Sequence, residues 1–188
     1  MMRAAVFCGS AHGTDPAFIK ETERLIQAMA DKNVNLVYGG GRVGLMGTLA
    51  DAALSSGMHV IGVMPQSLVN HELAHRGVSE LKVVKDMHER KSTMAENADF
   101  FIALPGGAGT LEEIFEAWTW AQLGLHNKAC AFFNVNGYFD SLFTFFERMI
   151  DDGFMKKAYS DMLIVSDDPD ELIEKALSYT PPPPKWVR

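Results

Sequence analysis

A glycine-rich turn near the middle of the chain carries the residue types that could bind an anion. It reads Pro105-Gly106-Gly107-Ala108-Gly109-Thr110, follows an apolar run and precedes an amphipathic run, as a turn between a strand and a helix would. Glycines allow a ligand to approach the backbone N–H groups closely. The helix that follows directs unpaired N–H groups and the positive end of its dipole at the same point. The turn therefore predicts a phosphate site.

Charged side chains adjoin this turn in the sequence. Glu113 lies four residues beyond Gly109, close enough to serve a sugar attached to the phosphate. Arg90 and Lys91 lie early in the preceding helix, where cations oppose the helix dipole, and this placement favours a functional role. The structural alternative is that Thr110 and Glu113 form a T-x-x-E capping box, which would only stabilise the start of a helix.

Strand-like and helix-like segments alternate along the chain, and their order predicts how these residues are positioned. The expected strands are 3–8, 35–38, 59–64, 81–84, 100–104, 129–133 and 163–165. The first expected helix begins at Asp15-Pro16. Further expected helices are 87–97, 111–123, 139–152 and 169–177. Met87, Met94 and Ala98 are expected on the apolar side of the helix 87–97. Continuous apolar strands that alternate with helices indicate a doubly wound, mainly parallel, Rossmann-like α/β sheet covered by helices on both faces. Ligands of such folds bind at the carboxyl ends of the strands, near the switch point.

A second glycine-rich turn follows the second expected strand and matches G-x-G-x-x-G at Gly39, Gly41 and Gly44. The dinucleotide fingerprint also needs an acidic residue at the end of the next strand. That strand ends Val63-Met64-Pro65, without a carboxylate, so neither NAD nor FAD is expected. Neither turn has the Gly-Lys-Ser/Thr of a P-loop. Together the two turns favour a mononucleotide.

Length, charge and cysteine content limit the possible partners and compartments. The 188 residues predict one domain, 1–180, followed by a proline-rich tail, 181–188, extended on the surface. The net charge of -7 argues against a nucleic-acid or anionic-membrane partner. Cys8 and Cys130 each lie in an apolar run and are expected to be buried free thiols. With neither a signal peptide nor a membrane-spanning run in the sequence, we expect a cytoplasmic protein.

The string His71-Glu72-Leu73-Ala74-His75 matches the H-E-x-x-H pattern of zinc proteases. No third ligand is evident and the stretch does not read as a long helix, so a chance match is the better interpretation. We therefore expect neither a metal nor a cofactor. Pyridoxal phosphate chemistry would need a buried Schiff-base lysine with an acidic partner for the pyridine nitrogen, and no lysine has such a setting in the sequence.

Two spaced motifs, Met87-x-x-Arg90-Lys91 and Pro105-Gly106-Gly107-x-Gly109-Thr110-x-x-Glu113, make the chain resemble the Lonely Guy family of cytokinin-activating phosphoribohydrolases. Members of this family were often labelled lysine decarboxylase-like. The similarity runs from Arg3 to Glu174. It implies hydrolysis of the N-glycosidic bond of a 5′-monophosphate of adenosine or N6-prenyl-adenosine, which gives the free base and ribose 5-phosphate. It also implies a homodimer with site residues near the interface.

The resemblance further assigns roles to individual residues. Arg90 and Glu113 would be catalytic, and the glycine turn would hold the phosphate. The implied substrate-binding residues are Ser10, Gly40, Gly41, Glu72, Lys91, Gly106, Gly107, Ala108, Gly109, Thr110 and Thr119. Ala108 stands where plant members often carry Tyr, and Arg42 where Ser is common, which would alter the substrate fit and add a cation.

A different class of function remains as the alternative. On the same fold, a non-catalytic nucleotide or cofactor carrier, similar to the molybdenum-cofactor carriers, would bind its ligand without releasing a product. Such a carrier would not need both Arg90 and Glu113.

Overall fold

Seven parallel strands form a single sheet in the computed structural model, which describes residues 1–69 and 73–182. The strand order is β4-β3-β2-β1-β5-β6-β7, and every neighbouring pair is parallel. The bounds are β1 (Arg3–Phe7), β2 (Asn35–Tyr38), β3 (Val60–Pro65), β4 (Glu80–Val84), β5 (Phe100–Ala103), β6 (Cys130–Phe133) and β7 (Leu163–Ser166). The predicted doubly wound α/β fold is confirmed.

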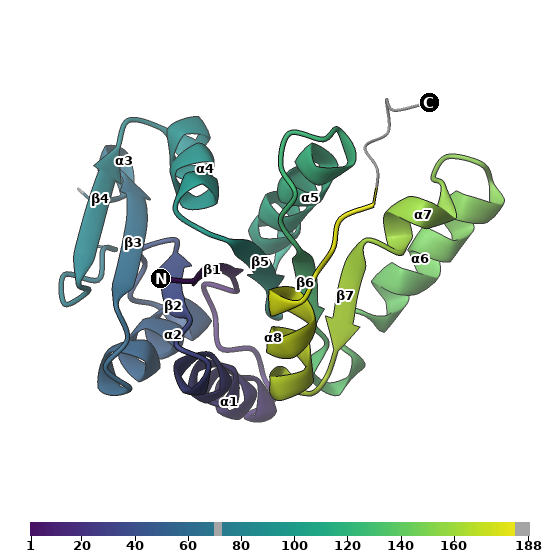
Figure 1. The fold of residues 1–188 in the computed structure, drawn as a ribbon. Helices are drawn as coiled ribbons and strands as arrows, with labels where there is room; N and C mark the ends of the chain where they lie inside the picture. The colour runs from purple at the N-terminus through teal and green to yellow at the C-terminus, as the bar shows by residue number, and fades with distance from the viewer. Residues whose placement is uncertain (70–72, 183–188) are drawn as a thin grey trace.

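Helices cover both faces of the sheet (Figure 1). One face carries α1 (Ala17–Asp31), α2 (Gly44–Ser55) and α8 (Pro169–Leu177), and the other carries α4 (Met87–Glu96), α5 (Ala108–Gln122) and α6 (Asp140–Asp151). The shorter elements are α3 (Gln66–Val69), η1 (Val135–Gly137) and α7 (Lys157–Ser160). Two apolar cores result, one on each side of the sheet, because each strand points alternate side chains to opposite faces.

The chain reverses its direction of winding at β1, which pairs with β2 on one side and with β5 on the other. The turns that follow β1 and β5 are bonded to each other, since the Gly9 N–H donates to the Pro105 carbonyl at 3.1 Å. The carboxyl ends of these two strands therefore form the switch point, where open α/β sheets bind ligands.

Most strand and helix bounds agree with the sequence within two residues, but the start of α5 does not. This helix begins at Ala108 after an N-cap at Gly107, so Thr110 lies inside its first turn. The capping-box interpretation of Thr110 and Glu113 is therefore wrong. The expectation for Met87 is also wrong. The sequence predicts it on an apolar helix face with Met94, but 46% of its surface is exposed.

Some expectations fall on segments that the structure does not describe. Glu72 and His71 lie outside the described residues, as does all but the beginning of the 181–188 tail. The short elements η1 and α7 were not expected from the sequence. Within residues 1–69 and 73–182, no helix combines the length and the apolar character needed to cross a bilayer.

Candidate active site

A cleft of about 340 Å³ lies at the switch point. The end of β1, the start of α5 and side chains from the neighbouring elements form its walls. They are Cys8, Gly9, Ser10, Met46, Met87, Arg90, Gly107, Ala108, Gly109, Thr110, Glu112 and Glu113. The predicted anion turn and both predicted catalytic side chains thus lie in one cavity.

The three glycines of the turn after β5 serve different structural purposes. A Cβ at Gly106 would lie 2.1 Å from the Thr110 hydroxyl oxygen and 2.8 Å from the Gly9 nitrogen, so packing excludes a side chain there. A Cβ at Gly107 or Gly109 would meet no heavy atom of the described residues within 4 Å, apart from its chain neighbours and the backbone of its own helix. These two glycines leave open space in front of the first N–H groups of α5, which have no intrahelical acceptor. Such a surface fits a phosphate group.

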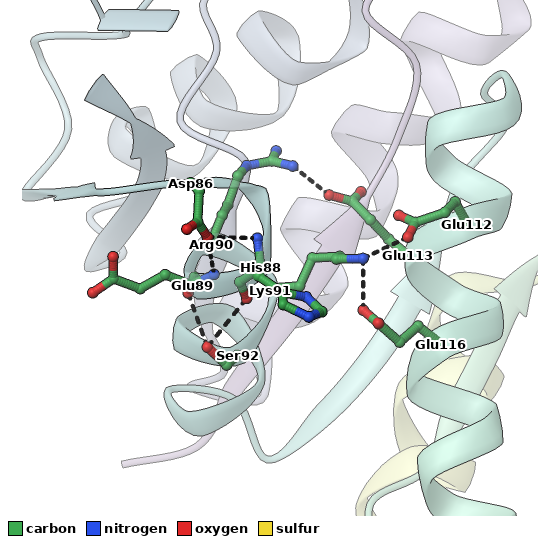
Figure 2. Close-up of polar contacts among 9 residues, drawn as sticks. All are labelled: Asp86, His88, Glu89, Arg90, Lys91, Ser92, Glu112, Glu113 and Glu116. Atoms are coloured by element: carbon green, nitrogen blue, oxygen red, sulfur yellow. Dashed lines mark hydrogen bonds and ion pairs between the residues drawn. The ribbon is translucent and has the colours of Figure 1, made fainter. Parts of the chain in front are cut away.

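Arg90 is held in place by a carbonyl, a carboxylate and a glycine. Its Nε donates to the Val63 carbonyl at 3.1 Å, and its Nη1 donates to Oε1 of Glu113 at 2.5 Å. A Cβ at Gly39 would lie 2.0 Å from Nη2 of Arg90, so the first glycine of the second turn makes room for the guanidinium. The Asp86 carboxylate caps α4, which fixes the turn that carries Arg90 (Figure 2).

Glu113 is a buried carboxyl group that faces a buried cation. The exposed fractions of the Glu113 and Arg90 side chains are 10% and 11%. Burial raises the pKa of Glu113 above its ordinary value, and the charge of Arg90 opposes this rise. A carboxylate in such a setting has a strong electrostatic effect on a positive charge that develops nearby, because little water screens it.

Lys91 forms a second link between α4 and α5. Its Nζ lies 2.5 Å from Oε1 of Glu112 and 3.0 Å from Oε2 of Glu116, as Figure 2 shows. The bond to Glu112 raises the pKa of Lys91. Lys91 does not appear among the described residues that line the cleft. The structure thus places it next to the site, bound to the same helix as Glu113.

The second glycine turn contributes to the cleft mainly through Met46. Gly40 has a positive φ of 77° and accepts a hydrogen bond from the His75 N–H at 2.8 Å, and Gly41 forms an isolated bridge with Ala74. A Cβ at Gly41 would lie 2.8 Å from Cε of Met46. Neither glycine belongs to the described lining of the cleft; they hold the turn and allow Met46 to reach it.

Thr119 lies on α5 but not in the cleft. Its exposed side chain contributes to a separate groove of about 270 Å³, formed with Phe115, Trp118, Gln122, Phe146, Met149, Phe154, Met155 and Tyr159. Within one chain the structure does not bring Thr119 together with Arg90 and Glu113.

Five residues of the cleft wall were missed or misread from the sequence: Cys8, Gly9, Met46, Met87 and Glu112. Cys8 was expected to be buried, but it is half-buried in the wall of the cleft at the end of β1, and burial together with the charge of Glu113 raises the pKa of its thiol. Met46 and Met87 add flexible apolar surface. The only available signals were the position of Cys8 at a strand end and of Met46 behind a glycine turn. Among the described residues, no group of three His, Cys, Asp or Glu could hold a metal ion.

Comparison with known proteins identifies the family. The family described as "Possible lysine decarboxylase" matches residues 46–176. The probable cytokinin riboside 5′-monophosphate phosphoribohydrolase LOGL2 of Oryza sativa subsp. japonica is 44% identical over 98% of this chain and 76% of its own length. The cytokinin riboside 5′-monophosphate phosphoribohydrolase LOG7 of Arabidopsis thaliana is 43% identical over 95% of this chain and 82% of its own.

Solved structures share the fold at much lower identity. The molybdenum cofactor carrier protein of Chlamydomonas reinhardtii has a TM-score of 0.70 at 18% identity, covering 95% of this chain and 99% of its own. The molybdenum cofactor binding protein of Rippkaea orientalis has a TM-score of 0.68 at 20% identity, covering 94% and 96%. On the strength of the far higher identity to LOGL2 and LOG7, the chain belongs to the Lonely Guy (LOG) family, which also carries the description "Possible lysine decarboxylase".

Proposed function

We propose that the protein hydrolyses the N-glycosidic bond of adenosine 5′-monophosphate or its N6-prenyl derivatives, giving the free base and ribose 5-phosphate. The observation that carries this proposal is the buried Arg90–Glu113 pair beside the open N-terminus of α5. The names of the relatives at 42–44% identity support the same reaction.

In the proposed complex, the 5′-phosphate lies against the turn from Gly107 to Thr110. The N–H groups at the start of α5 face an open space there, and Thr110 also lines the cleft. Binding at this remote group would align the ribose with the reacting side chains, so that phosphate binding energy contributes to catalysis.

Glu113 would act on the ribose. As the C1′–N9 bond breaks, the base leaves with the bonding electrons and a proton, and a water oxygen bonds to C1′. The transition state resembles an oxocarbenium ion, which a neighbouring carboxylate stabilises while it orients the water. Arg90 holds the Glu113 carboxylate through Nη1 and leaves further N–H groups of its guanidinium for the ribose or the phosphate.

The proposed substrate site is completed by the other residues that the resemblance implies, Ser10, Gly40, Gly41, Glu72, Gly106, Ala108 and Lys91. Ser10 and Ala108 line the cleft, which supports direct contact. Gly106, Gly40 and Gly41 would act by shaping the turns. Lys91 would act beside Glu112, and its bonds to two carboxylates do not favour a Schiff-base role in a lysine decarboxylase.

The direct test is adenine release from AMP, compared between the wild type and Glu113→Gln. A matched control is Glu21→Gln, because Glu21 also pairs with an arginine, Arg24, at 2.7 Å and its side chain is 16% exposed, but it lies on α1. We expect a loss in kcat of about 100-fold or more for Glu113→Gln and no change for Glu21→Gln. Turnover close to the wild type in Glu113→Gln would remove Glu113 from the mechanism.

The same assay separates the enzyme from a carrier. A carrier predicts stoichiometric binding of AMP with no adenine released, whereas the enzyme releases adenine over many turnovers. The carrier proteins resemble this chain at 18–20% identity, which shows the fold alone, so the more similar relatives favour the enzyme. A comparison of kcat/KM for AMP and isopentenyl-AMP would identify the preferred base.

We also propose that the protein is a cytoplasmic homodimer. The groove that contains Thr119 is rich in apolar side chains, and Phe154 at its edge is 88% exposed. A second copy covering this groove would bury Phe154 and bring Thr119 to the interface, as the family resemblance implies. Sedimentation analysis should give a dimer for the wild type and a monomer for Phe154→Asp; a monomeric wild type would refute this assignment. The charge of -7 does not favour nucleic acid or an anionic membrane as a partner.

A further inference from the structure

A tyrosine outside the described lining of the cleft is bonded to the proposed phosphate turn. The hydroxyl of Tyr138 donates to the Gly106 carbonyl at 2.7 Å. Tyr138 directly follows η1, after β6, so it reaches the turn from a segment 32 residues away in the chain. We propose that Tyr138 is a positioning residue for the phosphate site. This inference rests on the proposed function, in which the 5′-phosphate binds at Gly107 to Thr110.

The argument begins with the geometry of one peptide unit. The Gly106 carbonyl and the Gly107 N–H belong to the same planar trans peptide, so they point in opposite directions. When the Tyr138 hydroxyl holds the carbonyl, the direction of the Gly107 N–H is fixed as well. Gly107 lines the cleft, and a Cβ there would meet open space. The hydrogen bond on one side of the turn therefore orients a donor for the other side.

Glycine makes this restraint necessary. Two consecutive glycines, Gly106 and Gly107, give the peptide between them more rotational freedom than any other residue pair would. The preceding peptide is held by the bond from the Gly9 N–H to the Pro105 carbonyl, and the next carbonyl, of Gly107, accepts from the Thr110 N–H at 3.1 Å. Tyr138 supplies the corresponding restraint for the peptide between them.

The ring of Tyr138 is 45% exposed, and its buried part packs against two aromatic rings. It packs edge-on against Phe18 and Phe139, with ring centroids 5.7 Å and 4.9 Å away and interplanar angles of 84° and 88°. The segment before it is anchored by a bond from the Asn136 side chain to Asp15 at 3.0 Å. A hydroxyl on a ring that is held in this way is preorganised, so it restrains the turn at little entropic cost.

A second cavity, of about 320 Å³, adjoins the cleft, since Gly9, Ser10 and Gly107 line both, and it explains why the hydroxyl matters. Tyr138, Phe18 and Leu45 line it together with the backbone of Gly106 and Gly107. Without the hydroxyl, the Gly106 carbonyl would face this cavity, where water could bond to it from several directions. The peptide would then sample more orientations, and the Gly107 N–H would be lost to the phosphate for part of the time.

The test is Tyr138→Phe, which removes the hydroxyl and keeps the ring, with Tyr179→Phe as the matched control two residues after α8. We expect KM for AMP and Ki for ribose 5-phosphate to rise about 3- to 10-fold in Tyr138→Phe, as for the loss of one hydrogen bond. The value of kcat and the Ki of adenosine, which lacks the phosphate, should stay within twofold. Tyr179→Phe should match the wild type throughout.

Two outcomes would overturn the inference: a Tyr138→Phe variant that binds ribose 5-phosphate as tightly as Tyr179→Phe does, or one in which adenosine binding weakens as much as that of ribose 5-phosphate. The second result would show a general loosening of the cleft. A failure of the proposed function is distinguishable, because it would appear as a wild type that releases no adenine from AMP. In that case calorimetric titration with AMP, comparing wild type and Tyr138→Phe, still tests the role of Tyr138.

Discussion

Replacing Gly109 with alanine should separate folding from phosphate binding, because the structure gives the two effects opposite signs. Gly109 lies in the first turn of α5, and an added Cβ would meet no heavy atom of the described residues within 4 Å beyond its chain neighbours and the backbone of its own helix. Alanine stabilises a helix relative to glycine by up to about 1 kcal/mol. For a chain of this length, such a change raises the melting temperature by about 2–4 °C.

The same methyl group would project into the space proposed for the phosphate. A phosphate that can no longer approach the first N–H groups of α5 loses a charge-assisted hydrogen bond, worth about 1.5–3 kcal/mol. The KM for AMP should therefore rise about 10- to 100-fold. The Ki of adenosine should change little, because it has no phosphate to displace.

The assay combines thermal unfolding with steady-state adenine release, and Gly106→Ala serves as the comparison. At Gly106 the new Cβ would lie 2.1 Å from the Thr110 hydroxyl oxygen, so this variant should lose stability as well as activity. Gly109→Ala should instead gain stability and lose affinity. A Gly109→Ala variant that melts higher and keeps the wild-type KM for AMP would place the phosphate elsewhere and refute the reasoning.

Three further predictions concern the charged side chains of α4 and α5 that contact one another. Because burial raises the pKa of Glu113, kcat/KM for AMP should fall on the acid side with an apparent pKa above 4.5, and a rate profile of Glu113→Gln should lack this limb. Arg90→Ala leaves the Glu113 carboxylate buried and unpaired at pH 7, which should lower the free energy of unfolding by about 3–5 kcal/mol. In this variant Glu113 binds a proton more readily in the folded than in the unfolded state. Urea titrations should therefore show the loss of unfolding free energy shrinking as the pH falls through the raised pKa of Glu113. A loss that does not depend on pH would contradict the pairing. Lys91→Met breaks the ion pairs to Glu112, which is 54% exposed, and to Glu116, so it should cost about 1 kcal/mol or less in stability and less than tenfold in kcat. A 100-fold loss in kcat would place Lys91 in the chemistry.

The sequence predicts the sheet well because most of its strands, the edge strand β4 excepted, are largely continuous apolar runs. A strand buried on both faces needs apolar residues at every position, and this signal does not depend on distant contacts. β5 and β6, for example, are buried at all four positions each. The helix α7 has four residues and no buried one, so no periodic pattern marks it.

The site is predictable in its members but not in its contacts. Arg90 and Glu113 follow from motif and topology, since both lie on helices that begin at the same edge of the sheet. The role of Gly39 does not follow, because it depends on a guanidinium that arrives from a residue 51 positions later in the chain. The bond of Tyr138 to Gly106 is equally invisible in the sequence, because no local pattern links them.

The wrong capping-box interpretation has a physical cause that supports the proposed site. A T-x-x-E box needs a free glutamate, but Glu113 is bound to Arg90, and the N-cap of α5 is Gly107, which has no side chain. A side-chain cap stabilises a helix by about 1 kcal/mol, as the Asp86 and Asp168 carboxylates do for α4 and α8. At α5 the described structure gives up this contribution: the Thr110 N–H donates to the Gly107 carbonyl, and the earlier N–H groups of the helix face the cleft. A phosphate that binds there would supply the missing acceptor, so ligand binding should also raise the stability of this helix.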